Sequence, residues 1–190
     1  MIDKVSLRHA QYVLRVVLVI ALCSPGLSNE GFASPDAITE SEVKAAYLYN
    51  FAKFIAWPER SFATADAPME ICVLDDTSFG STLREIVYSH TVDGHPVQVV
   101  NVTAVAGAHD CHILFIPSLQ AKQVRALIEA IGYKSIVTVG ETQGFLEEGG
   151  IIQFALQEGK VKFQVNLHAA ARSGVRISAR LLGIATRVIQ

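Results

Sequence analysis

The stretch Cys111-His-Ile-Leu-Phe-Ile116 ends in four large apolar residues and carries no formal charge. A short apolar run of this kind is typical of a β-strand that is buried on both faces of a sheet. Two further strand-like runs precede it, Glu70–Leu74 and His95–Asn101, and a fourth covers Ser135–Val139. We therefore expect a sheet covered by other elements on both sides.

The segments between these runs have helical character. Ser78–Tyr88 is predicted as one helix, and Leu119–Ala130 as an amphipathic helix that stops at Gly132. Strands that alternate with helices indicate an α/β fold with a mostly parallel sheet and flanking helices.

The C-terminal third departs from this alternation. Ile151–Leu156 and Val161–Val165 flank a short polar turn, which predicts an antiparallel hairpin. Asn166 is expected to cap a short helix, and Ser178 a final helix that continues to about Val188.

Before the first strand, a helix is predicted from Thr39 to Trp57. Thr39 and Glu42 have the spacing of a capping box, and Pro58 disfavours helical geometry at the residue before it. This helix is apolar nearly all round, so it is either buried on both sides within the domain or has a partner. Its aromatic residues are the predicted partner-binding set: Tyr47, Tyr49, Phe51, Phe54 and Trp57.

The first 33 residues are predicted to be a signal peptide. Lys4, Arg8 and Arg15 precede the apolar run Val16–Cys23, and Pro25-Gly26 follow it. The run is about eight residues long, against roughly twenty for a membrane-spanning helix. Cleavage before Ser34 is the preferred site, with Leu27-Ser28 and an uncleaved anchor as alternatives.

The remaining residues, 34–190, are long enough for a single domain with its own core. The formal net charge of the full chain is −2 at pH 7, which does not favour nucleic acid as a partner. We find no internal repeat and no low-complexity segment.

Several of these segments resemble the YfiR/HmsC-like family of periplasmic proteins. The residues that carry the resemblance lie in Lys44–Phe54 with Trp57-Pro58, in Phe163–Leu167 with Ile177–Leu182, and in Cys111–Ile116. The resemblance covers roughly residues 40 to 189. It implies a Rossmann-like domain, often a dimer, that acts as a regulator and not as an enzyme.

The resemblance further implies repression of a membrane-bound diguanylate cyclase through its periplasmic sensor region. Repression would lower cyclic-di-GMP and, with it, biofilm formation. Two departures concern partner specificity. The second cysteine pair that some members carry near 144–154 is missing from this sequence, and His168 and Ala171 stand where an acidic and a basic residue are expected.

Cys72 and Cys111 are the two cysteines that remain after cleavage, and each lies at a strand. In an oxidising compartment we predict a disulfide between them, since the first and third strands can be neighbours in a doubly wound sheet. Two reduced, buried thiols are the alternative. If the bond forms, one hypothesis is that its reduction loosens the sheet edge and releases a partner.

Other candidate chemistry is sparse. Asp75, Thr77 and Ser78 follow the first strand, where open α/β sheets bind ligands, and are a candidate small-ligand site together with the loop after Val139. His109-Asp-Cys-His112 is interpreted as a polar strand entrance and not as a metal site. The sequence has no dinucleotide-binding glycine motif and no nucleophile elbow, so we predict neither a cofactor nor an enzyme.

The interpretation that combines these features is a periplasmic regulator of a membrane-bound diguanylate cyclase, expected to be a homodimer. The alternative is a periplasmic ligand-binding accessory protein of another envelope receptor or histidine kinase. Arg172, Arg176, Arg180 and Arg187 are interpreted as a solvated basic face, with an acidic partner or lipid headgroups as alternatives.

Overall fold

The computed structural model describes residues 38–190 except 118 and 133. The predicted signal peptide and its cleavage site lie outside these residues. Within the described part, no helix has both the length and the apolar character needed to cross a membrane.

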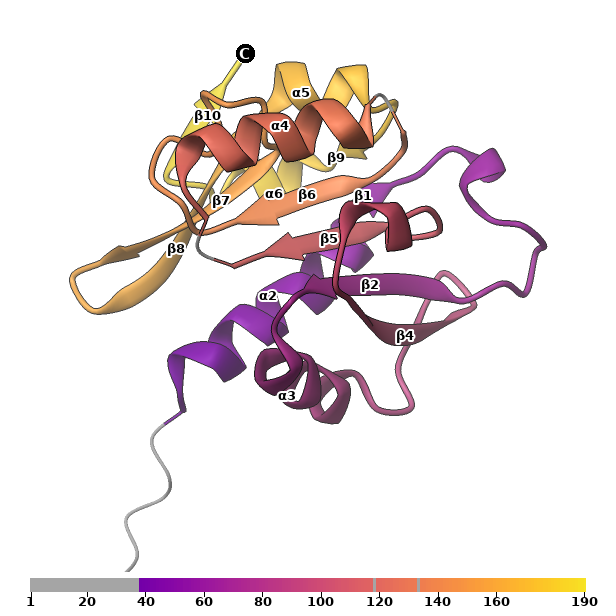
Figure 1. Cartoon of the computed structure of the whole chain (residues 1–190). Helices are drawn as coiled ribbons and strands as arrows, with labels where there is room; N and C mark the ends of the chain where they lie inside the picture. Colours follow the sequence, from indigo (N-terminus) through magenta and orange to yellow (C-terminus); the bar gives the residue numbers. More distant parts are fainter. Residues whose placement is uncertain (1–37, 118, 133) are drawn as a thin grey trace, which may run out of the picture. The chain divides into compact units, whose positions relative to one another are not determined.

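An eight-stranded mixed sheet forms the centre of the domain (Figure 1). Its strand order is β10-β8-β7-β6-β5-β2-β4-β3, and all neighbours are parallel except the pairs β3–β4 and β7–β8. The strands are β2 (Met69–Leu74), β3 (Thr91–Val92), β4 (His95–Val102), β5 (Ile113–Ile116), β6 (Val137–Gly140), β7 (Ile152–Gln157), β8 (Lys160–Asn166) and β10 (Arg187–Ile189). The α/β class, the mostly parallel sheet and the C-terminal antiparallel hairpin are therefore confirmed.

The remaining elements are helices and one small accessory sheet. The α-helices are α2 (Glu40–Phe54), α3 (Thr77–Val87), α4 (Ala121–Ile131), α5 (Leu167–Arg172) and α6 (Ala179–Leu182). Two 3-10 turns, η1 (Glu59–Ser61) and η2 (Val105–Gly107), lie in loops. The accessory sheet is the antiparallel pair of β1 (Ile55–Ala56) and β9 (Arg176–Ile177).

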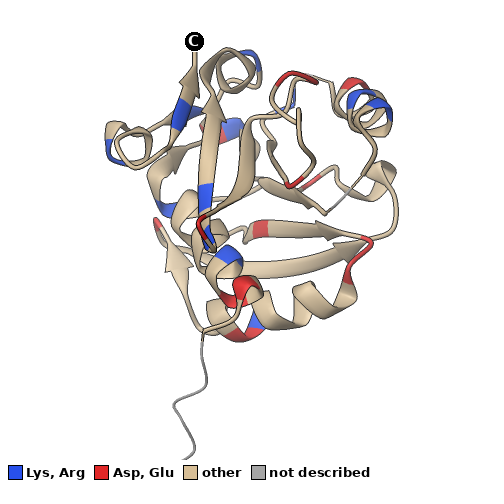
Figure 2. Ribbon diagram, turned by 90° about the vertical axis from the view of Figure 1, so that its left-hand side faces the viewer, with Lys and Arg blue, Asp and Glu red and all other residues tan. Residues whose placement is uncertain are grey.

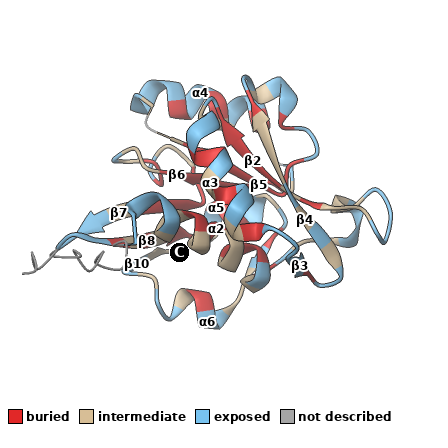
Figure 3. Cartoon of the chain, turned by 90° about the horizontal axis from the view of Figure 1, so that it is seen from below, coloured by how far each residue is buried: buried red, intermediate tan, exposed pale blue. Residues whose placement is uncertain are grey.

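Each face of the main sheet packs into its own hydrophobic cluster. Ile71 and Val73 of β2 join the cluster that contains α2 and α3, whereas Cys72 and Leu74 join the cluster that contains α4. This alternation follows from the two-residue period of a strand. Figure 3 shows the buried positions concentrated along the strands and on the helix sides that face them.

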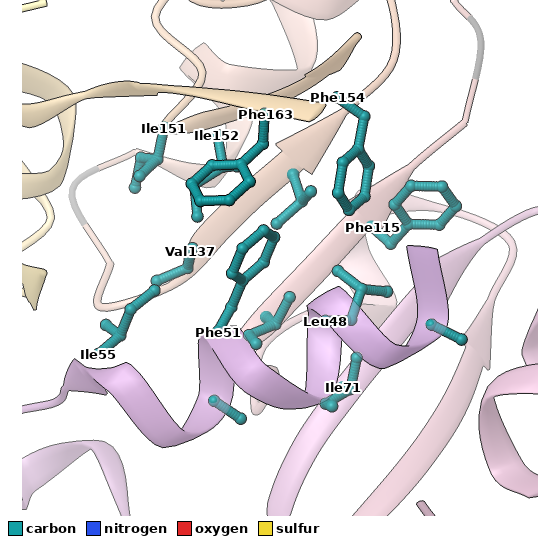
Figure 4. Close-up of a cluster of buried hydrophobic side chains, with 14 of the residues drawn as sticks. Leu48, Phe51, Ile55, Ile71, Phe115, Val137, Ile151, Ile152, Phe154 and Phe163 are labelled. Atoms are coloured by element: carbon teal, nitrogen blue, oxygen red, sulfur yellow. The ribbon is translucent and has the colours of Figure 1, made fainter. Parts of the chain in front are cut away.

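Helix α2 adds two large buried side chains, Leu48 and Phe51, to the first cluster. The predicted capping box is confirmed, because the Glu42 amide donates to Thr39 Oγ1 over 3.2 Å and the Thr39 amide donates to the Glu42 carboxylate over 2.7 Å. Leu48 and Phe51 are fully buried and point at the sheet, toward Phe115, Phe154 and Phe163 (Figure 4). Burying such side chains is worth about 1.5–3 kcal/mol each.

Two boundaries differ from the sequence prediction. Helix α2 ends at Phe54 and not at Trp57, because Ile55 and Ala56 pair with Ile177 and Arg176 and the Ser178 amide donates to the Phe54 carbonyl. The predicted final helix is also wrong beyond Leu182. Its last segment forms β10, which pairs with β8 and extends the main sheet by one strand.

Candidate functional site

The predicted disulfide between Cys72 and Cys111 is present. Cys72 lies in β2 and Cys111 lies just before β5, and these strands are adjacent and parallel, with 5.8 Å between the two Cα atoms. Both cysteines are buried in the cluster beneath α4. β2 and β5 are inner strands of the sheet, so the hypothesis that reduction would loosen a sheet edge is wrong.

The predicted partner-binding aromatic residues divide into two groups. Phe51 is fully buried, and its ring stacks on Phe154 and meets Phe163 edge-on, with centroids 5.8 and 5.1 Å apart. Tyr47 is half-buried against the same two rings. Direct contact between Phe51 and a partner is therefore excluded in this structure, since the ring belongs to the core.

Tyr49, Phe54 and Trp57 keep part of their surface exposed. Tyr49 meets the ring of His90 edge-on at 4.8 Å, and Lys53 Nζ lies 5.3 Å from the Tyr49 ring centroid, within cation–π range. A partner role for these three residues stays a prediction.

The small-residue side of α2 has an occupant within the chain. Ala45 and Ala52 are completely buried, and α3 packs against α2. The close helix approach that alanines permit is therefore made by α3, which corresponds to the first of the two alternatives for this helix, burial on both sides within the domain.

The candidate ligand residues lie at the carboxyl end of β2, as predicted. Asp75 has a left-handed backbone conformation with φ of 52°, and the side chain of the next residue, Asp76, accepts the Phe79 amide at the start of α3. Asp75, Thr77 and Ser78 are exposed. They face solvent around a helix cap, and ligand binding by them stays a prediction.

The His109–His112 segment leads into β5, and its side chains have different partners. Cys111 is in the disulfide, and the exposed His109 accepts from Lys134 Nζ through Nδ1 over 2.7 Å. Across the described residues, no three His, Cys, Asp or Glu side chains are grouped so that they could hold a metal ion.

Comparison with known proteins shows which family the chain matches. Residues 41–186 match the family described as YfiR/HmsC-like, which is most of the chain. The chain belongs to the YfiR/HmsC-like family. A search among curated proteins gives no significant match.

Among solved structures, this YfiR/HmsC-like chain is similar to one described as a conserved domain protein from Vibrio cholerae O1 biovar El Tor strain N16961. The TM-score is 0.54 at 14% sequence identity. The match covers 79% of this chain and 60% of the Vibrio chain, so it spans less than two thirds of that protein. A likeness at this identity shows the fold alone.

Sequence reasoning missed the environment of His112 in this YfiR/HmsC-like domain. His112 is 3% exposed and accepts the Glu70 amide through Nδ1 over 3.1 Å. Burial lowers the pKa of His112 from 6.5 to about 4, and His95 lowers it further by a smaller amount. The Ser61 main chain and the Asp110 carboxylate act in the opposite direction and raise this pKa, but by less than burial lowers it. The histidine is therefore neutral at pH 7.

Basic and acidic residues are interspersed along the ribbon of the domain (Figure 2). Of the four predicted surface arginines, Arg187 pairs with Glu147 over 2.9 Å, and both side chains are about half exposed. Such exposed pairs contribute little to stability. Arg172, Arg176 and Arg180 are also exposed, in agreement with a solvated location.

Proposed function

We propose that this protein is a periplasmic regulator that binds the periplasmic sensor region of an inner-membrane diguanylate cyclase and represses it. The consequence is a lower level of cyclic-di-GMP and less biofilm. The observation that carries the proposal is membership of the YfiR/HmsC-like family over residues 41–186. The disulfide supports an oxidising location such as the periplasm, because such bonds are rare in reducing compartments.

The proposed mechanism is occupancy. The regulator binds the inactive state of the cyclase more tightly than the active state, so binding shifts the population toward the inactive state. This requires a folded surface that a partner can reach, and not a catalytic group. The protein is accordingly proposed to act without enzymatic activity and without a cofactor.

The proposed contact surface is the exposed side of α2 and the segment that follows it. Tyr49, Phe54 and Trp57 keep part of their surface exposed, as does Tyr47 beside the rings of Phe154 and Phe163, and Lys53 adds a positive charge beside Tyr49. Tyrosine and tryptophan are frequent in binding hot spots because they bury a large area with little loss of side-chain entropy. A homodimer is proposed on the family resemblance.

The test is the intracellular cyclic-di-GMP level in cells that lack the gene and in cells to which it is restored. A rise on deletion that the restored gene reverses supports repression of a cyclase. An unchanged level, with the protein shown to be expressed, contradicts the proposal and favours an accessory role at another envelope receptor or histidine kinase.

A pair of matched variants tests the contact surface. Tyr49→Glu places a negative charge on the exposed side of α2, and Ala126→Glu adds the same charge at an exposed position on α4. We expect the deletion phenotype with Tyr49→Glu and full repression with Ala126→Glu, at equal amounts of folded protein by circular dichroism. Equal repression by both variants would remove Tyr49 from the contact surface.

A further inference from the structure

Three buried polar groups without a partner in hydrogen-bond geometry belong to His112, to Trp57 beside it and to Ser61. In the described part of the chain, Trp57 Nε1, Ser61 Oγ and His112 Nε2 are each shielded and have no partner in hydrogen-bond geometry. The Phe62 ring stacks on His112 with centroids 4.3 Å apart, and the Trp57 ring lies 6.0 Å from His112. Each unpaired group costs about 1–3 kcal/mol, so three together call for an explanation.

The hydrogen bond to β2 fixes which nitrogen of His112 carries the proton. Nδ1 accepts from the Glu70 amide, so the proton of the neutral ring is on Nε2, which acts as a donor. Nε2 is at the other end of the ring, away from β2. The Ser61 main chain is close enough to favour the charged ring, although no hydrogen bond to Nε2 forms.

His112 and Ser61 both line a surface hollow of about 350 Å³ at the amino ends of β5 and β6. We call it the His112 hollow; its lining also includes Asp110, Cys111, Lys134 and Ser135. Two hydrogen-bond donors that lack an acceptor in hydrogen-bond geometry, an imidazole N–H and a serine hydroxyl, therefore lie beneath this lining, each shielded from solvent.

The charges around the His112 hollow favour an anion. Arg60 and Lys134 bring two positive charges to its lining, and Asp110 is its one acidic residue. With Asp110 counted and the histidines neutral, the formal charge of the lining is about +1, which matches an anion of a single negative charge. Ile136 and Ala63 add apolar surface to the same lining.

We propose that the His112 hollow binds a small monocarboxylate, which displaces the lining side chains that shield His112 Nε2 and Ser61 Oγ so that its oxygen atoms accept from both. Hydrogen bonds between a charged acceptor and buried donors are among the stronger ones in proteins. The ligand would satisfy two of the three unpaired groups. This site is separate from Asp75, Thr77 and Ser78, which lie at the carboxyl end of β2, and it does not rest on the proposed repression.

The test uses the full chain as the cell processes it, with the disulfide intact, and follows the His112 imidazole and backbone amides by NMR. The probes are acetate, lactate and benzoate, with benzamide as the uncharged match to benzoate. We expect a saturable shift of the His112 Nε2–H and Glu70 amide signals with at least one carboxylate, and none with benzamide.

Three variants locate the binding. His112→Asn keeps an acceptor for the Glu70 amide but removes the Nε2 donor, and we expect about a tenfold or greater loss of affinity. Ser61→Ala should weaken binding severalfold. His90→Asn, at an exposed histidine outside the lining, is the matched control and should bind normally.

Three results would overturn the proposal. The first is no saturable shift with any of the three carboxylates. The second is an equal response to benzamide, which would show apolar binding only. The third is unchanged affinity in a folded His112→Asn protein. After any of these results, the two donors would be assigned to interactions with the Ser61 carbonyl or with solvent, and not with a carboxylate ligand.

Discussion

His112 folds into the domain as a neutral side chain, since burial lowers its pKa to about 4. In the unfolded chain the same group titrates near 6.5. Between these values the unfolded state binds more protons than the folded state, so the free energy of unfolding decreases as the pH falls. The stabilisation is complete above about pH 6.5 and is lost progressively toward pH 4.

We therefore expect the wild-type protein to lose about 1–2 kcal/mol more stability than His112→Asn between pH 7.5 and pH 5. Urea unfolding at the two pH values measures this difference. His90→Asn, which removes an exposed histidine, should follow the wild type. Parallel pH profiles for wild type and His112→Asn would show that His112 does not titrate in this range.

A second residue-scale prediction compares a core side chain with an exposed one. Phe51→Ala removes a fully buried ring that contacts Phe154 and Phe163, and should cost about 3–5 kcal/mol. Leu156→Ala, at a side chain that is 61% exposed, should change stability by no more than about 0.5 kcal/mol. Chemical denaturation measures the free energy of unfolding of both variants. A small loss of stability in Phe51→Ala would contradict the place of Phe51 in the core.

At the scale of elements, the loop after β6 depends on two glycines. The buried Phe145 ring lies where a Cβ atom on Gly140 or on Gly150 would have to be. Because this ring has no free space into which to move, an added methyl group forces a rearrangement of the loop.

Gly150→Ala should therefore destabilise the protein by about 1–3 kcal/mol, the usual range for overpacking. Gly107→Ala is the matched control, since a Cβ there would meet Val102 at an ordinary 3.5 Å. Thermal unfolding of the two variants provides the comparison. Equal melting temperatures would mean that the loop adapts to the added methyl group without strain.

Element type was predictable wherever the local pattern and the tertiary structure agree. The strand at Ile113–Ile116 is one example, because burial on both faces of a sheet requires a run of apolar residues. The capping box at Thr39 is another, because its hydrogen bonds join residues only three positions apart. Ile55, Ala56, Arg187 and Val188 were predicted as helix because the pairing that makes them strands is with residues more than 20 positions away.

The sites were harder to predict than the elements. The disulfide was predicted from two cysteines at neighbouring strands of a chain with a predicted export signal. The His112 hollow could not be predicted, because the sequence does not show that Phe62 covers a histidine 50 positions later, at the entrance of β5.

At the scale of the whole molecule, the disulfide joins the inner part of the sheet. β2 and β5 lie between β6 on one side and β4 on the other, and both cysteines are buried beneath α4. Loss of the bond should therefore act on the whole domain. The entropy of closing a loop with a separation of 39 residues corresponds to at most about 4 kcal/mol.

The double variant Cys72→Ser, Cys111→Ser should accordingly lower the free energy of unfolding by about 2–4 kcal/mol. Hydrogen exchange provides the sharper measurement, because global destabilisation reduces the protection of the slowest amides in β4 and in β8 by the same factor. Reduction of the wild-type bond should have the same effect. Loss of protection only around residues 72 and 111 would instead show that the disulfide stabilises the structure locally. In that case the bond could open without unfolding the surface that we propose for the cyclase.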